Sequence, residues 1–328
     1  MSLRTLGLIA LAVYVLLIAA VAAAARRARR DTSPADHFLA GRSLGPLVLL
    51  LTLYATAYSG NSLLGFPGEA YRRGFSWIMA TGFMMAIIVV LHALVPRLRP
   101  VATAGRFVSP GDWIRHRFRD EPGARALVIG VAVLMAIAST NFLLAQLMAM
   151  GHVTTQVTEG AIPYWAGVLG LAGVILAYET LGGMRAVAWT DAVQGLIMMV
   201  ALAALFGWLL GEQGGLAAAT RAIAVQRPEA VAVPNWRECA NWASSICLMG
   251  LASVVYPQMI QRIYAAESGR TLQRSLALMT FMPLLTTTVV TLIGIAATSI
   301  EIDPPSRKRS EGHGNRQCVS FRFSHSAA

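Results

Sequence analysis

Apolar residues fill eight long runs of this chain, and short polar or glycine- and proline-containing connections separate the runs. A membrane-spanning helix needs about 20 mainly apolar residues. The runs of that length cover residues 5–25, 45–67, 75–96, 126–149, 161–181, 190–210, 240–260 and 276–299. The pattern predicts an all-α fold, a polytopic membrane helix bundle of eight spans over residues 1–300. Residues 301–328 contain no such run, and we expect them to form a separate, non-membrane tail.

The second run differs from the others because polar and helix-loosening residues interrupt its second half. The residues concerned are Tyr58, Ser59, Gly60, Asn61, Ser62, Gly65, Pro67 and Gly68. At membrane depth such residues are tolerated where they line a cavity or face other helices. Interrupted spans also mark the binding sites of secondary transporters. A helix contact rich in glycine and serine is the alternative interpretation.

If the helix is broken here, its free polar groups form a candidate binding site. Carbonyl oxygens that lose their helical partners can bind a small cation, and Ala55 and Tyr58 lie just before the Ser-Gly pair. Side chains that offer donors and acceptors to a solute are those of Ser59, Asn61 and Ser62. Because Gly60 and Pro67 loosen the helix, we expect them to take part in gating.

The seventh run carries a second group of small and polar residues. They are Ser244, Ser245, Gly250, Ser253 and Pro257. If the architecture repeats five helices in inverted form, this run is the structural partner of the second run. Gly250 and Ser253 are then candidate solute-binding residues. The alternative is a helix kinked by proline and packed through small residues.

Asp191 places a carboxylate at the start of the sixth run, where exposure to lipid would be costly. It could therefore lie on the route by which a cation leaves the protein. Alternatively, it caps the helix and accepts hydrogen bonds from amides of the first turn. The residues alone leave both interpretations open.

The charges indicate an orientation in the membrane. The chain is 56% hydrophobic and 13% charged, with a formal net charge of +11. With the amino terminus outside, sixteen arginines fall in cytoplasmic segments and six on the opposite side before residue 300. The positive-inside rule explains this excess, so the charge points to a lipid bilayer as partner and not to nucleic acid. We expect a multi-pass protein of the plasma membrane, the bacterial inner membrane.

No group of residues indicates an enzyme. The histidines are scattered without acidic or cysteine partners, and no Walker-type phosphate-binding loop is present. The three cysteines have neither the spacing nor the even number of a metal or disulfide framework. We therefore expect no catalytic residue, no cofactor and no metal ion other than a coupling cation.

Five segments, taken together and in order, resemble the sodium/solute symporter family of the proline, pantothenate and sodium/glucose carriers. The segments are Phe38–Gly45, Ser59–Gly60 with Gly65–Gly68, Ser109–Phe118, Tyr178–Gln194 and Tyr256–Arg262. The resemblance implies the leucine-transporter fold, in which one extra helix precedes two inverted repeats of five helices. Runs two to six would form the first repeat, and runs seven and eight would begin a truncated second repeat.

The resemblance also implies a function, sodium-coupled symport of a small organic solute with sodium as the coupling ion. Ala55 and Tyr58 match the positions that hold sodium through backbone carbonyls. Arg42 matches a coupling-sensitive arginine, and Asp191 matches an aspartate near the inner sodium path. No pattern points to a particular solute, sodium stoichiometry or oligomeric state.

Two departures from the family pattern change these expectations. Proline carriers have an aspartate two residues before the Ser-Gly pair, where this chain has Ala57. Family members have more helices than the eight predicted here, and the tail from Glu301 is what a frameshift or a premature end would leave. We therefore expect that residues 1–328 alone do not transport. Two other classes stay open: a transporter-like sensory membrane module of a signalling protein, and a non-transporting fragment.

Overall fold

The computed structural model describes residues 2–29, 31, 33–212 and 214–297, and all their regular elements are helical. The α-helices are α1 (Leu3–Arg27), α2 (Pro34–Leu39), α3 (Pro46–Ala57), α4 (Phe66–Arg73), α5 (Ala80–Ala104), α6 (Pro110–Arg117), α7 (Ala124–Val157), α8 (Tyr164–Glu212), α9 (Leu216–Gln226), α10 (Trp236–Ala252), α11 (Pro257–Ala265), α12 (Gly269–Met279), α13 (Met282–Leu285) and α14 (Thr287–Ala296). The shorter 3₁₀- and π-helical turns are η1 (Ala40–Arg42), η2 (Asn61–Gly65), η3 (Gly74–Met79), η4 (Pro228–Val231) and η5 (Ser253–Val255). The predicted tail, 301–328, lies outside the described residues.

The prediction of an all-α membrane bundle is confirmed, but the helices are divided differently from the eight runs. In the described part of the chain, five helical stretches are long and apolar enough to cross a membrane. They are Leu3–Arg27, Ser62–Ala104, Ala124–Val157, Tyr164–Glu212 and Gly269–Ala296. If α10 and α11, which meet at a 49° bend, form one broken span, they add a sixth.

Two of the five stretches contain backbone breaks at glycines with positive φ. Gly183 (φ 60°, ψ −159°) divides α8, and Gly74 (φ 68°, ψ −147°) separates α4 from η3 and α5. Both conformations lie in a region that glycine adopts far more readily than any other residue. If the stretches are divided at these glycines, and if α3 with α4 and α10 with α11 are each taken as halves of one span, the helices correspond in order to the eight predicted runs.

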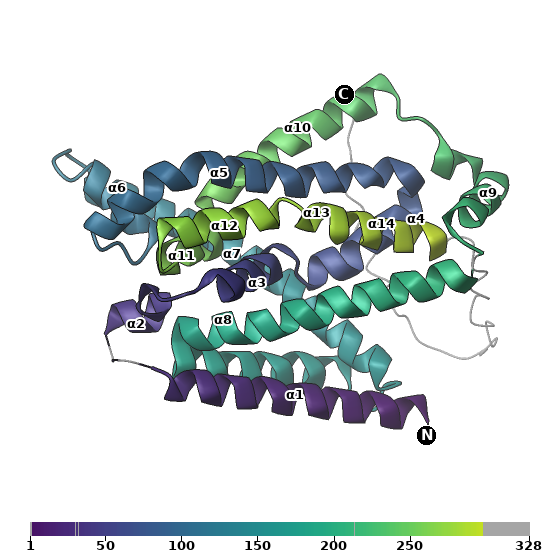
Figure 1. Cartoon of the computed structure of the whole chain (residues 1–328), viewed down its shortest axis with the longest axis horizontal. Helices are drawn as coiled ribbons and strands as arrows, with labels where there is room; N and C mark the ends of the chain where they lie inside the picture. The colour runs from purple at the N-terminus through teal and green to yellow at the C-terminus, as the bar shows by residue number, and fades with distance from the viewer. Residues whose placement is uncertain (1, 30, 32, 213, 298–328) are drawn as a thin grey trace, which may run out of the picture.

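The two ends of the bundle carry different short elements (Figure 1). α2, α6 and α11 lie together at one end, which we call the α6 end, and α9 lies at the opposite end beside α14. At the α6 end, Asp36 on α2 forms a buried ion pair with Arg185, which follows Gly183 (Oδ1–Nη2 2.6 Å). This pair fastens α2 to the turn between the two halves of α8.

α3 lies in the interior of the bundle, where it packs against α8, α11 and α12. Its buried residues Leu49 and Leu53 belong to the main hydrophobic core, together with Leu91 on α5, Ile263 on α11 and Leu272 on α12. The amino-terminal half of the second run is therefore held firmly. Its other half, α4, packs against α14 instead.

A close backbone contact fixes α4 against α14. A Cβ atom at Gly294 would lie 2.3 Å from the carbonyl oxygen of Pro67 and 2.7 Å from its Cα. Because these are backbone atoms, they cannot rotate away. We expect Gly294→Ala to lower the free energy of unfolding by about 1–3 kcal/mol, the usual cost of overpacking.

Unfolding in mixed micelles, followed by tryptophan fluorescence, measures this effect. The matched control is Gly207→Ala, since Gly207 lies on α8 with open space where its Cβ would be. The control should be neutral or slightly stabilising, because alanine favours helix more than glycine does. Equal losses in the two variants would contradict the close contact.

Candidate functional site

The second run is broken between α3 and η2. α3 ends at Ala57, and Tyr58 adopts an extended conformation (φ −109°, ψ 95°). The Tyr58 N–H still donates to the Tyr54 carbonyl at 2.9 Å, and the Leu63 N–H donates to the Ser59 carbonyl at 3.0 Å. Within the described residues, however, no hydrogen bond reaches the carbonyl oxygen of Ala55 or that of Tyr58. The two carbonyl groups selected from the sequence are therefore available to a ligand.

A cavity of about 750 Å³ lies beside the break, bounded by α1, α7 and α8. The break itself contributes Ala55, Tyr58, Ser59 and Gly60 to the wall. Most of the remaining wall is apolar, with side chains such as Ile18, Met150 and Met198. Its polar side chains beyond the break are all uncharged: Tyr14, Gln146, Thr154, Thr158, Tyr178 and Gln194. The cavity can thus enclose a small, mainly apolar molecule with a few uncharged polar contacts.

Gln146 on α7, which was not among the residues predicted from the sequence, contacts the break through both ends of its amide. Its Nε2 donates to Ser59 Oγ at 3.0 Å, and its Oε1 accepts the Gly60 N–H at 3.1 Å. The side chain thereby satisfies two polar groups next to the free Tyr58 carbonyl. A signal was available, because a glutamine inside a membrane-length apolar run usually faces protein or water.

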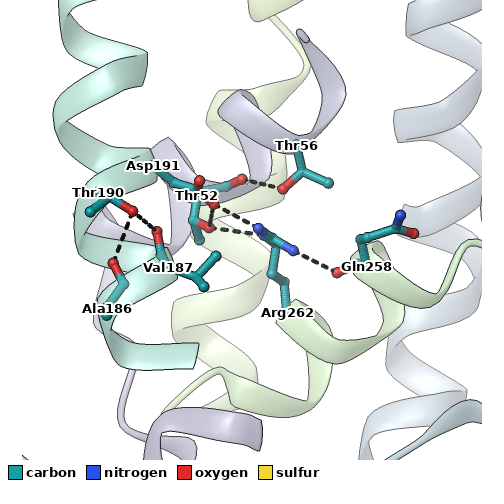
Figure 2. A network of polar contacts seen from close by, with 8 residues as sticks. All are labelled: Thr52, Thr56, Ala186, Val187, Thr190, Asp191, Gln258 and Arg262. Atoms are coloured by element: carbon teal, nitrogen blue, oxygen red, sulfur yellow. Dashed lines mark hydrogen bonds and ion pairs between the residues drawn. The ribbon is translucent and has the colours of Figure 1, made fainter. Parts of the chain in front are cut away.

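Asp191 belongs to a separate network beside α3, shown in Figure 2. Its Oδ2 accepts a hydrogen bond from Thr52 Oγ1 at 2.5 Å and pairs with Arg262 Nη2 at 2.6 Å. Arg262 also donates from Nε to Thr52 Oγ1 at 2.8 Å and from Nη1 to the Gln258 carbonyl at 3.0 Å. The side chains of the charged pair are only 14% and 7% exposed. The network joins α3, α8 and α11 three residues before Ala55.

The interpretation of Asp191 as a helix cap is wrong. Asp191 lies eight residues after Gly183, about two turns into the second half of α8. First-turn amides are out of reach, and the carboxylate instead binds side chains from two other helices. Asp191 is also absent from the cavity wall, so the structure separates it from the carbonyls of Ala55 and Tyr58. Its place on a cation route stays a prediction.

Arg42 lies at the α6 end, where the connection between α2 and α3 meets other elements. Its Nη2 donates to the Phe107 carbonyl at 2.8 Å, and its Nη1 donates to the Tyr264 carbonyl at 3.4 Å. Close by, the Leu44 N–H donates to the Ala265 carbonyl at 3.1 Å. Arg42 thus links α11 and the loop before α6 to the start of α3. Its role in coupling stays a prediction.

Ser62, Pro67, Gly250 and Ser253 are not among the residues of the cavity wall. Ser62 is buried in η2, and the side chain of Asn61 is outside the described part of the structure. Gly250 packs against Ala86 on α5, and Ser253 donates to the Gly250 carbonyl at 2.6 Å. The geometry does not bring Gly250 or Ser253 to the cavity beside Ser59, so their contact with a solute stays a prediction. The same holds for gating by Gly60, which lines the cavity, and by Pro67, which contacts Gly294.

Comparison with known proteins gives a consistent family match. A model described as the sodium:solute symporter family matches residues 37–320. The chain is 34% identical to the high-affinity proline transporter PutP of Bacillus subtilis over 177 residues, which are 53% of this chain and 36% of that protein. It is 28% identical to the sodium/pantothenate symporter of Escherichia coli over 226 residues, 68% of this chain and 46% of that one.

A longer match and a solved structure extend this result. The chain is 26% identical to the sodium/glucose cotransporter of Vibrio parahaemolyticus over 322 residues, 92% of this chain and 57% of that protein. A substrate-bound, outward-open Na⁺-coupled sialic acid symporter has a similar fold, with a TM-score of 0.74 and 16% identity over 91% of this chain and 62% of that one. The chain thus spans about half the length of the curated relatives that it matches.

Proposed function

Because this chain belongs to the sodium:solute symporter family, we propose that it serves sodium-coupled symport of a small organic solute. It is a multi-pass membrane protein, with several apolar helices of membrane length. The proposal includes a location in the plasma membrane, with the amino terminus outside and the α6 end facing the cytoplasm. Arginine is concentrated at that end, as the positive-inside rule requires.

One observation carries the cation part of this proposal. The carbonyl oxygens of Ala55 and Tyr58 lie at a helix break beside a cavity and accept no hydrogen bond from the described residues. Leaving a carbonyl group without a hydrogen bond inside a membrane costs about 2 kcal/mol of free energy or more. A sodium ion held by these oxygens would remove that cost, since hard cations prefer oxygen ligands.

The cavity suggests which solutes fit beside the cation. Its wall carries no charged side chain, and the polar groups of Ser59 and Gln146 lie at the break. A solute with net charge would have no counter-ion except the bound cation itself. We therefore expect the solute to be neutral or zwitterionic, or to present a carboxylate toward the sodium ion.

The network around Asp191 supplies the element that closes the cytoplasmic side. Its ion pair with Arg262 joins α8 to α11, while Thr52 joins both to α3. Alternating access requires a packed element with two arrangements whose populations the ligands shift. Breaking this ion pair would separate α11 from α8 and open a path from the break toward the α6 end.

Sodium binding by the purified chain tests the proposed function. We expect saturable binding of ²²Na⁺ that unlabelled sodium displaces and potassium does not. Gly60→Val should abolish it, because a side chain here would press on Gln146 and Ala149, 3.2 and 3.3 Å from an added Cβ. Gly170→Val, in open space on α8, is the matched control and should bind as the unmodified chain does. Absence of saturable binding in the unmodified chain would contradict the proposal.

A further inference from the structure

Gln146 is the side chain that binds the polar groups of the break. Its two hydrogen bonds reach Ser59 Oγ and the Gly60 N–H, at 3.0 and 3.1 Å. Both partners lie within two residues of the Tyr58 carbonyl. In a continuous helix the Gly60 N–H would donate to the Thr56 carbonyl, four residues back. In this structure the Gly60 N–H donates to Gln146 Oε1 instead, so this amide depends on the Gln146 side chain for its hydrogen-bond partner.

The break has few other contacts that could set its shape. The Tyr58 ring packs on Tyr54, with centroids 4.9 Å apart, and its hydroxyl receives a long hydrogen bond from Thr287 at 3.4 Å. These contacts fix the side chain of Tyr58, and the Ser59 carbonyl accepts the Leu63 N–H at 3.0 Å. The Ser59 hydroxyl and the Gly60 N–H are left to Gln146. No other side chain in the described residues donates to or accepts from Ser59 or Gly60.

We propose that Gln146 is a positioning residue that sets the sodium affinity of the site by fixing the Ser59–Gly60 backbone and hence the direction of the Tyr58 carbonyl. This inference rests on the proposed function. A preorganised ligand oxygen binds a cation more tightly than one that must be ordered on binding. Because α7 carries Gln146 and also borders the cavity, a solute that moves α7 or bonds to this amide would change sodium affinity.

Three substitutions separate positioning from general stability. Gln146→Leu keeps the size of the side chain and removes both hydrogen bonds. Gln146→Glu keeps an acceptor for the Gly60 N–H and can accept from the Ser59 hydroxyl. Gln156→Leu makes the same change on the same helix, at an exposed position away from the break. We expect Gln146→Leu to raise the half-saturating sodium concentration about tenfold, the loss of roughly one net hydrogen bond. Gln146→Glu and Gln156→Leu should not raise it.

Hydrogen–deuterium exchange of the chain in nanodiscs provides a readout that does not depend on sodium. In sodium-free buffer, amides in a peptide covering residues 58–65 should exchange faster in Gln146→Leu than in the unmodified chain. Gln146→Glu should retain protection, and Gln156→Leu should match the unmodified chain. Unchanged exchange in Gln146→Leu would overturn the positioning role.

The combined outcomes distinguish this inference from the proposed function. In one outcome, the unmodified chain binds no sodium while the amides of residues 58–65 exchange faster in Gln146→Leu. In that case the proposed function fails, but Gln146 still fixes the backbone of the break. If the unmodified chain binds sodium and Gln146→Leu has the same half-saturating concentration, the inference fails alone.

Discussion

Asp191→Ala should lower the free energy of unfolding by about 3–5 kcal/mol, the usual cost of leaving one partner of a buried ion pair uncompensated. Arg262 is only 7% exposed, and its guanidinium would keep hydrogen bonds to Thr52 and the Gln258 carbonyl but lose its sole counter-ion among the described residues. Unfolding in mixed micelles, followed by tryptophan fluorescence, measures the change. The same substitution should also weaken the closure of the α6 end.

The matched control removes a carboxylate from an exposed ion pair. Glu69 pairs with Arg72 at 2.6 Å and with Arg73 at 2.8 Å, and both arginines are more than half exposed. Because solvent screens such pairs, Glu69→Ala should cost less than about 1 kcal/mol. If Arg262→Met is added to Asp191→Ala, part of the lost stability should return, since the uncompensated charge is gone. Equal losses in Asp191→Ala and Glu69→Ala would contradict a structural role for the buried pair.

Gly183→Ala should be nearly as damaging, with a loss of about 2–5 kcal/mol from backbone strain and overpacking together. Gly183 adopts φ 60° and ψ −159°, a conformation that a Cβ atom strongly disfavours. The added Cβ would also lie 2.5 Å from the His37 carbonyl oxygen. Relief of this contact requires α2 to move, which would strain the ion pair between Asp36 and Arg185.

Thermal unfolding of the chain in detergent, followed by circular dichroism, compares Gly183→Ala with Gly170→Ala. Gly170 lies on the same helix in ordinary helical conformation, with open space around its Cα. The control should be neutral or more stable, because alanine is the better helix former. A melting temperature for Gly183→Ala equal to that of the control would mean that the turn tolerates a side chain.

The local sequence was sufficient to predict the helix break at Ser59–Gly60. It was not sufficient to predict that Gln146 binds the break. Ser59 and Gly60 within an apolar run predict a break in the helix, because each residue weakens the helical hydrogen bonds around it. Gln146 lies 86 residues away in sequence from Gly60, so only packing of α7 against η2 brings the two together. A scan of each apolar run for single polar residues would have selected it as a candidate without assigning its partner.

For Asp191, the sequence alone could not predict which residues the carboxylate binds. Its position at a predicted helix start favoured a capping role, and only the resemblance to the symporter family favoured a functional one. The start itself was placed too late, because the turn at Gly183 is tight and the helix resumes at once. Its partners Thr52 and Arg262 come from two other runs, and neither is marked by local sequence as a contact of Asp191.

The proposed sodium ligand is the Tyr58 carbonyl, and one isotope-labelling measurement reports on this group alone. Tyr58–Ser59 is the sole Tyr–Ser pair in the sequence, so carbonyl-¹³C tyrosine with ¹⁵N serine labels a single peptide bond. Solid-state NMR of the chain in lipid then reports this one carbonyl. We predict a saturable change in its ¹³C shift as sodium replaces potassium, with a weaker response in Gln146→Leu. A shift that stays constant from potassium to saturating sodium would contradict sodium binding at Tyr58.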